Sequence, residues 1–121
     1  SMVVGTEEAM AQTRLYRKRL GGGMRQAGVL AGAGLIALEE MPARLGEDHA
    51  NARWLAGRLG EMPGILVTHR VETNIVIFDI GGAGLTTAEF SARLRSRGVL
   101  MNGINPTLMR LLTHFDVSRE D

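Results

Sequence analysis

The sequence predicts a helical first half that leads into a small layer of mixed helix and strand. Three observations support this fold class: cap and stop residues that divide the first half into three helices, two apolar runs typical of strands in the second half, and a capping box between those runs. Of the 121 residues, 45% are hydrophobic and 22% are charged, which is typical of a globular chain and excludes wholesale disorder.

Three helices are expected in the first half. Thr6 is a good N-cap, and the helix that follows should end at about Arg19, before Gly21-Gly22-Gly23. A second helix is expected over Met24–Glu40. It carries several glycines, each unfavourable in a helix by about 1 kcal/mol relative to Ala, so we expect close packing and burial. Pro42 suits the first turn of a third helix, which should run to about Leu59.

The second half should contain short strands around one helix. Thr86 and Glu89 have capping-box spacing, so a helix is expected from Thr86 to about Arg97, with Gly98 just beyond its end. The residue types predict strands at Ile65–Val67, Asn74–Ile80, Val99–Met101 and Met109–Thr113.

The two ends of the chain predict further elements. Met2-Val3-Val4 has the composition of a short strand with no partner nearby, and Ser118 has the features of an N-cap with acidic residues after it. We therefore expect the chain to be an internal or trimmed portion of a longer protein.

Composition argues against several classes of partner. The 14 basic and 13 acidic residues give a net charge of +1 and aromatics are 4%, so neither a nucleic-acid surface nor a membrane surface is expected. The longest apolar run, Ala27–Leu38, is shorter than the roughly 20 residues that span a bilayer. Cysteine is absent, which excludes disulfides and thiolate zinc sites and fits a reducing compartment; we expect the cytoplasm.

The glycine triplet and the basic residues beside it have two interpretations each. Glycines ahead of a helix, with Arg25 nearby, suit a phosphate, but a flexible joint between helices explains them equally simply. Arg17-Lys18-Arg19 is either a solvated helix end or part of an anionic-ligand site. Lys18 is the single lysine, but a flexible helix end is a weak position for a Schiff base.

Arg110 is the most informative polar residue of the second half. It interrupts an apolar strand, so it either pairs with an acid at a surface edge or points into a carboxylate-binding site. The histidines lack the paired spacing of metal ligands, so no metal site is predicted, and His49, beside Glu47 and Asp48, is interpreted as surface polar.

Four segments together resemble low-specificity L-threonine aldolases, in that family's order and spacing. They are Leu20–Ala31, Glu47–Ala52, Glu72–Asn74 and Arg110–Glu120. The resemblance covers nearly the whole chain. It implies an α/β PLP-dependent transferase fold (type I), with residues 1–40 forming the tail of the large cofactor domain and the connecting helix, and residues 41–121 a small α+β C-terminal domain, incomplete at its end.

The resemblance also implies a reaction and a site. Pyridoxal 5'-phosphate (PLP) would act as electron sink while a β-hydroxy amino acid, L-threonine or L-allo-threonine, is cleaved to glycine and acetaldehyde. Arg110 resembles the arginine that clamps the substrate carboxylate, whereas Lys18 and Arg25 resemble residues near the cofactor. The Schiff-base lysine would fall just before residue 1. We therefore expect no catalytic lysine in this chain, no covalently bound cofactor and no turnover by these residues alone. A homo-oligomer, a tetramer in the family, is implied.

Two alternatives remain open. The second interpretation is a related PLP-dependent β-eliminating lyase acting on aromatic amino acids or cysteine conjugates, although the Gly21–Gln26 segment favours the aldolase. A non-enzymatic phosphate- or nucleic-acid-binding domain, using the basic stretch Arg14–Arg25, is the third interpretation, although the low net charge weighs against it.

Overall fold

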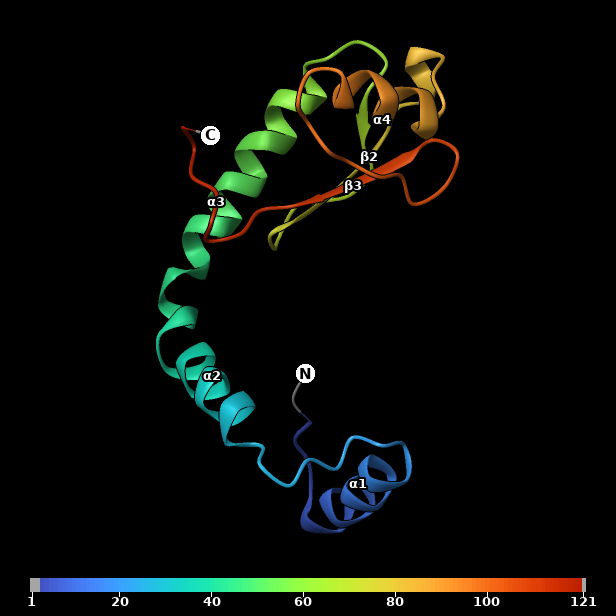
Figure 1. Ribbon diagram of the computed structural model, residues 1–121. Helices are drawn as coiled ribbons and strands as arrows, with labels where there is room; N and C mark the ends of the chain where they lie inside the picture. The colour runs from blue at the N-terminus through green and yellow to red at the C-terminus, as the bar shows by residue number, and fades with distance from the viewer. Residues whose placement is uncertain (1–2, 121) are drawn as a thin grey trace. The chain divides into compact units, whose positions relative to one another are not determined.

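The computed structural model describes residues 3–120. The chain divides into two compact units, Ser1–Glu39 and Glu40–Asp121. Their elements, labelled in Figure 1, are α1 (Glu7–Arg19) and α2 (Gly28–Glu39) in the first unit, then α3 (Met41–Gly60), β1 (Leu66–Val67), β2 (Ile75–Asp79), the 3₁₀ turn η1 (Gly81–Ala83), α4 (Thr87–Arg95) and β3 (Leu108–Leu112) in the second. Within residues 3–120, no helix combines the length and the apolar character that crossing a membrane requires.

Helix α1 begins and ends where local signals predict. The Thr6 hydroxyl accepts a hydrogen bond of 3.3 Å from the N–H three residues later. At the other end, Gly22 N–H donates to Arg17 O at 2.8 Å and Gly21 N–H donates to Lys18 O at 3.2 Å. This pair of bonds is a Schellman motif, and the φ of +80° at Gly21 is the left-handed conformation that it requires.

Helix α2 starts later than expected, at Gly28 rather than Met24. No residue of α2 is buried, and Val29 is 82% exposed. A helix that is apolar on all sides and uncovered within its own unit presents the kind of surface that marks an interface.

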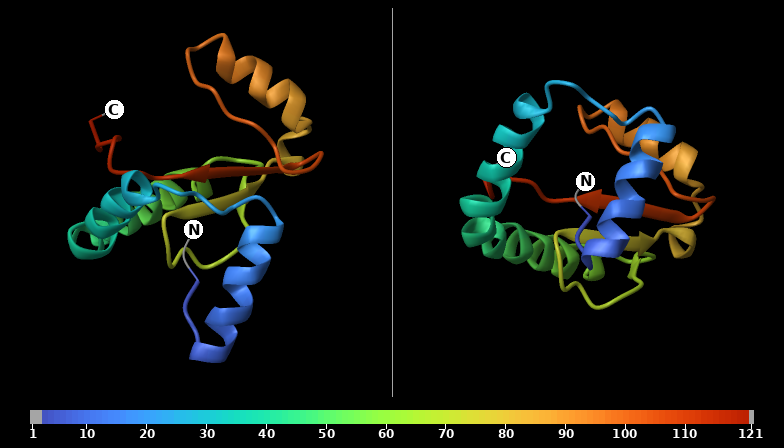
Figure 2. Two further views of the ribbon diagram at one scale, coloured as in Figure 1. Left: turned by 60° about the horizontal axis from the view of Figure 1, so that its bottom comes forward. Right: turned by 90° about the horizontal axis from the view of Figure 1, so that it is seen from below.

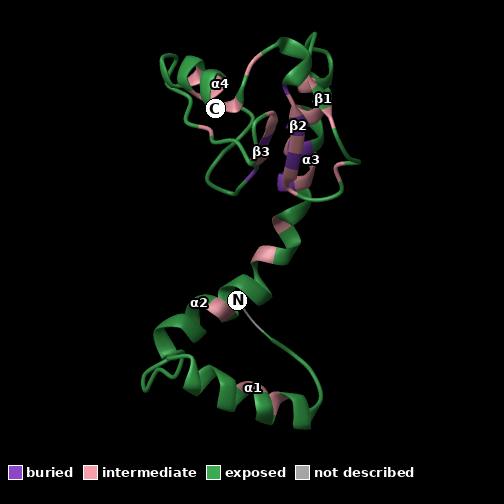
Figure 3. Ribbon diagram, turned by 90° about the vertical axis from the view of Figure 1, so that its right-hand side faces the viewer, coloured by how far each residue is buried: buried purple, intermediate pink, exposed green. Residues whose placement is uncertain are grey.

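The second unit is built on an antiparallel three-stranded sheet in the order β1-β2-β3. Helix α3 contacts β1 and β2 and runs beside the sheet (Figure 2). The fully buried hydrophobic residues come from α3, β2, β3 and the residue after β2: Ala52, Val76, Phe78, Ile80 and Met109. Figure 3 shows the buried positions gathered in this unit, whereas α1 and α2 carry none. The predicted strands around residues 66, 77 and 110 are therefore confirmed.

Helix α4 confirms its predicted caps. Thr86 N–H donates to Glu89 Oε2 at 2.8 Å, and Glu89 N–H donates to Thr86 Oγ1 at 3.3 Å, which completes the capping box. Gly98 has a φ of +83° and donates to Arg95 O at 3.0 Å, as expected for the residue after a helix end.

Three predicted elements are wrong. Val99–Met101 is not a strand: only Gly103, further along, forms an isolated bridge, with Met109, and Leu100 is 79% exposed. Val3 and Val4 form no strand, while Met2 lies outside the described residues. Ser118 Oγ accepts a 3.1 Å hydrogen bond from Glu120 N–H, but residues 118–120 are not helical. In each case the residue types favoured a strand or a helix, but the backbone there does not form the ladder or the helical turn that such an element needs.

Candidate functional site

Arg110 lines a cavity of the second unit. It is the central residue of β3, faces Ile77 across the ladder, and is exposed between the buried Met109 and the half-buried Leu111. Because side chains alternate along a strand, Arg110 lies on the sheet face opposite the core. The cavity has a volume of about 620 Å³ and lies among the end of α4, the loop that follows it and β3. It is lined by Arg95, Leu100, Met101, Asn102, Gly103, Ile104, Arg110, Leu111 and Leu112.

The polar lining of this cavity is cationic. Arg95 and Arg110 carry its charges, Asn102 adds an amide, and no acidic residue lines it. Among residues 3–120, neither arginine forms an ion pair. Of the two interpretations of Arg110, pairing with a local acid is therefore not seen among residues 3–120, and a role in binding a carboxylate stays a prediction.

The glycine triplet does not form a phosphate cradle at the start of a helix. Gly21 and Gly22 donate their N–H groups to carbonyls of α1, and α2 begins only at Gly28. Of the two interpretations of the triplet, the joint between helices is the one that fits Gly21 and Gly22, because their position belongs to the end of the preceding helix. Lys18 and Arg25 are both exposed on the first unit. They are thus in a different unit from Arg110, and their proximity to a cofactor stays a prediction.

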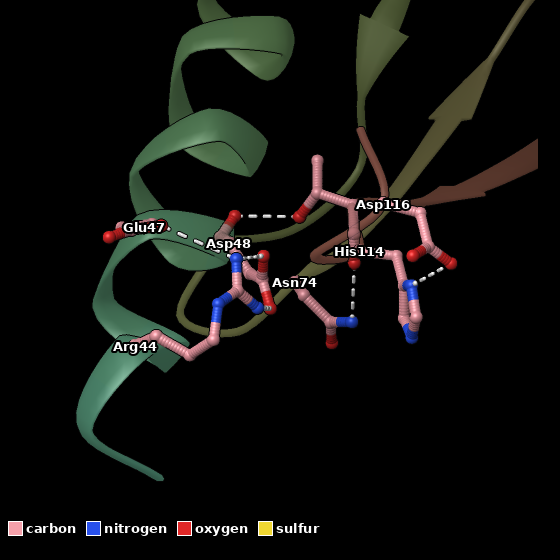
Figure 4. A network of polar contacts seen from close by, with 7 residues as sticks. Arg44, Glu47, Asp48, Asn74, His114 and Asp116 are labelled. Atoms are coloured by element: carbon pink, nitrogen blue, oxygen red, sulfur yellow. Dashed lines mark hydrogen bonds and ion pairs between the residues drawn. The ribbon is translucent and has the colours of Figure 1, made fainter. Parts of the chain in front are cut away.

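A polar cluster that the sequence interpretation missed links α3 to the end of β3 (Figure 4). Asp48, named in the sequence analysis only as a neighbour of His49, is itself only 4% exposed. Its carboxylate accepts hydrogen bonds of 3.3 and 3.4 Å from Arg44, and its backbone carbonyl accepts a 2.6 Å hydrogen bond from the Thr113 hydroxyl. Arg44 and Asp48 are four residues apart on one helix face, and that spacing is the signal that could have identified the pair.

The histidines do not form a metal site. His114 Nδ1 lies 3.2 Å from Asp116 Oδ2 on the surface, and His69 Nε2 lies 3.3 Å from Ile75 O. Over residues 3–120, no three acidic or histidine side chains gather closely enough to hold a metal ion.

The second unit thus combines a small α+β layer with a cavity that two arginines line. Comparison with known proteins specifies the family. The family model described as beta-eliminating lyase matches residues 1–82, and the chain belongs to this family, which is PLP-dependent.

Individual relatives extend the likeness to the whole chain. The chain is 40% identical over 120 residues to the low specificity L-threonine aldolase of Escherichia coli K12, covering 99% of this chain and 34% of the relative. It is 37% identical over 123 residues to low-specificity L-threonine aldolase 1 of Arabidopsis thaliana, covering 100% of this chain and 34% of the relative. It is also 33% identical over 110 residues to the alanine racemase TOXG of Cochliobolus carbonum, covering 85% of this chain and 28% of the relative. The chain thus spans about a third of the length of these curated relatives.

The described residues do not by themselves fit a complete PLP site. The cofactor is held as an imine by a lysine whose position must be fixed. Lys18, the single lysine of the sequence, is exposed on the last turn of α1. What the described residues offer is a cavity of about 620 Å³ lined by two arginines.

Proposed function

We propose that the chain is a segment of a PLP-dependent aldolase that cleaves L-threonine or L-allo-threonine to glycine and acetaldehyde. The observation that carries the proposal is the identity of 37–40% to two threonine aldolases over essentially all 121 residues. The acid-free cavity around Arg110 supports it, because an amino-acid substrate needs a cation for its α-carboxylate. The type I fold, a cytoplasmic location and a homo-oligomer belong to the same proposal.

Arg110 is assigned the role of binding the substrate carboxylate. Its guanidinium is always charged and presents two parallel N–H donors, so it fixes the orientation of the substrate as well as its affinity. Orientation matters for this reaction class, because the bond that breaks at Cα is the one held perpendicular to the cofactor ring.

The alanine racemase relative favours a second candidate reaction on the same fold. A carboxylate-binding arginine serves any α-amino acid, so Arg110 does not distinguish aldol cleavage from elimination or racemisation. Turnover of the full-length enzyme with threonine, alanine, tryptophan and tyrosine separates these reactions. The aldolase proposal expects acetaldehyde from threonine to exceed every other product.

The Arg110→Ala substitution in the full-length enzyme tests the site. Removing a charge-assisted pair costs on the order of 2–4 kcal/mol, so kcat/KM should fall roughly 30- to 1000-fold. Cofactor absorbance should persist, and lysine at this position should rescue only partly because an ammonium lacks the fork.

The matched control is Arg70→Ala. Arg70 is 89% exposed and its only ion pair, within the described part of the chain, is with Glu72 at 3.6 Å. This substitution should leave kcat/KM unchanged. A near-normal kcat/KM in Arg110→Ala would return Arg110 to the status of a surface residue on an edge strand.

A further inference from the structure

We infer that Thr113 is a positioning residue for Arg110: it fixes the end of β3 to α3 and to the segment before β2, and thereby sets where the Arg110 guanidinium lies. The inference rests on the proposed function, since it assumes that Arg110 binds the substrate carboxylate. It concerns a residue that contacts neither substrate nor cofactor and acts only through the strand.

Thr113 is bonded through three of its polar groups. Its hydroxyl donates to Asp48 O on α3 at 2.6 Å. Its N–H donates to Asn74 O at 3.0 Å, and its carbonyl accepts from Asn74 Nδ2 at 2.9 Å. Thr113 is 6% exposed, so water does not replace these partners if they are lost. The partners are 65 and 39 residues away in sequence, so these bonds fix tertiary structure rather than a local turn.

The helix segment that receives the hydroxyl is itself held in place. The Asp48 carboxylate is bonded to Arg44, whose guanidinium carbon lies 5.4 Å from the centre of the Phe115 ring. Phe115 is only two residues beyond Thr113. Figure 4 shows Arg44, Asp48 and Asn74 directed toward the chain that leaves β3. Helix α3 thus contacts the chain at the end of β3 through two residues, Thr113 and Phe115.

The bonds of Thr113 fix the register of β3, and the register determines the sheet face on which Arg110 lies. Met109 is fully buried and Leu111 packs against the core, so Thr113 continues the inward-facing row while Arg110 faces outward. A slip of one residue would exchange the two faces and carry Arg110 toward the core. β3 is the last strand of the sheet, and apart from its ladder with β2 it forms, among residues 3–120, only the isolated Gly103–Met109 bridge, so its other edge gives little further restraint near Leu112. The bonds of Thr113 extend that restraint one residue beyond the Ile75–Leu112 pair.

The experiment is a double-substitution cycle in the full-length enzyme. Thr113→Val keeps the shape of the side chain and removes the hydroxyl, and we expect kcat/KM for threonine to fall about tenfold, mainly through KM. Thr113→Ser restores the hydroxyl and should bring kcat/KM back to within about twofold of the parent. In an Arg110→Ala background, Thr113→Val should change kcat/KM by less than about twofold, because the group it positions is gone.

Controls separate positioning from loss of stability. Thr86→Ala removes the cap of α4 and lowers thermal stability, but should leave kcat/KM unchanged at temperatures where the enzyme is folded. If Thr113→Val does not fold, Asn74→Ala removes the Nδ2 donor at a half-buried residue and should show a smaller, threefold or so, loss with the same dependence on Arg110.

The outcomes distinguish the positioning role of Thr113 from the carboxylate-binding role of Arg110. An equal effect of Thr113→Val, or of Asn74→Ala, with and without Arg110 overturns the positioning role while leaving the carboxylate assignment intact. A normal kcat/KM in Arg110→Ala alone overturns the assignment, and the positioning role with it. Unchanged kcat/KM in Thr113→Val overturns the positioning role directly.

Discussion

The two units of this chain differ in whether their helices and strands pack around buried hydrophobic residues. The second unit packs α3 and a sheet around five fully buried hydrophobic residues. The first unit has none in either helix: α1 is a polar helix defined by its caps, and α2 is an apolar helix with no cover. For α1, caps and stop residues are enough to predict where the helix begins and ends, whereas α2 begins four residues later than expected. Pairing between remote residues creates the core, and the fully buried hydrophobic residues of the described part of the chain lie in the second unit.

This contrast predicts that a core substitution acts on one unit alone. Phe78 is fully buried and pairs with Met109 across β2 and β3, so Phe78→Ala should lower the free energy of unfolding of the second unit by about 3–5 kcal/mol. Trp54, the single tryptophan, lies on α3 and reports on this unit by fluorescence during denaturant unfolding.

The control for Phe78 lies on α2. Val29 is 82% exposed, and Val29→Ala should move the Trp54 transition by less than about 0.5 kcal/mol. Equal shifts for the two variants would mean that the units share one core and that the contrast between them is false.

The second prediction concerns the uncovered helix. A shallow apolar hollow of about 440 Å³ runs along α2, lined by Ala27, Leu30, Ala31, Gly34, Leu35 and Leu38. We expect the 121-residue chain to self-associate through this face. Leu35→Lys should weaken association about tenfold or more, since burying a leucine contributes about 1.5–3 kcal/mol. Sedimentation equilibrium over a range of concentrations measures the change.

A leucine on the other unit provides the comparison. Leu66 on β1 is 66% exposed, and Leu66→Lys should leave the association constant unchanged. A chain that stays monomeric at all concentrations would show that α2 needs no partner, contrary to what its composition indicates.

The helix ends that the sequence predicted correctly are those whose determinants are local. Thr6, the Thr86–Glu89 pair and Gly98 act within a few residues of themselves, so their residue types were sufficient. The failures have the opposite cause. Val99–Met101 has strand-forming residues, but a strand requires a partner, and the residues that would have to pair with it cannot be read from its own composition.

The residues of the candidate site also differ in whether the local sequence identifies them. Arg110 was identifiable because a charged residue in an apolar strand is locally anomalous. Arg95, its neighbour in the cavity, was not identified, because a basic residue at a helix end is ordinary. Asp48 and Thr113 were missed because their importance arises from one contact across 65 residues. Positions that matter through remote contacts became visible only in the folded chain.

The smallest predicted effect concerns the pH dependence of the capping box. The hydrogen bond from Thr86 N–H, followed by that from its hydroxyl and by the charge of Arg93, holds the pKa of Glu89 below its ordinary value of 4.5. A carboxyl whose pKa is lowered in the folded state stabilises that state above its unfolded pKa, and this stabilisation is lost as pH falls through the folded pKa. Because Glu89 is exposed, the effect should be small. Glutamine still accepts the Thr86 hydrogen bonds but does not titrate. The difference in melting temperature between the parent chain and Glu89→Gln should therefore be constant from pH 7 to about pH 5 and shrink below the ordinary carboxyl range. A difference that stays constant down to pH 3 would show that the Glu89 charge contributes nothing to the cap, and that its hydrogen-bond geometry alone defines the start of α4.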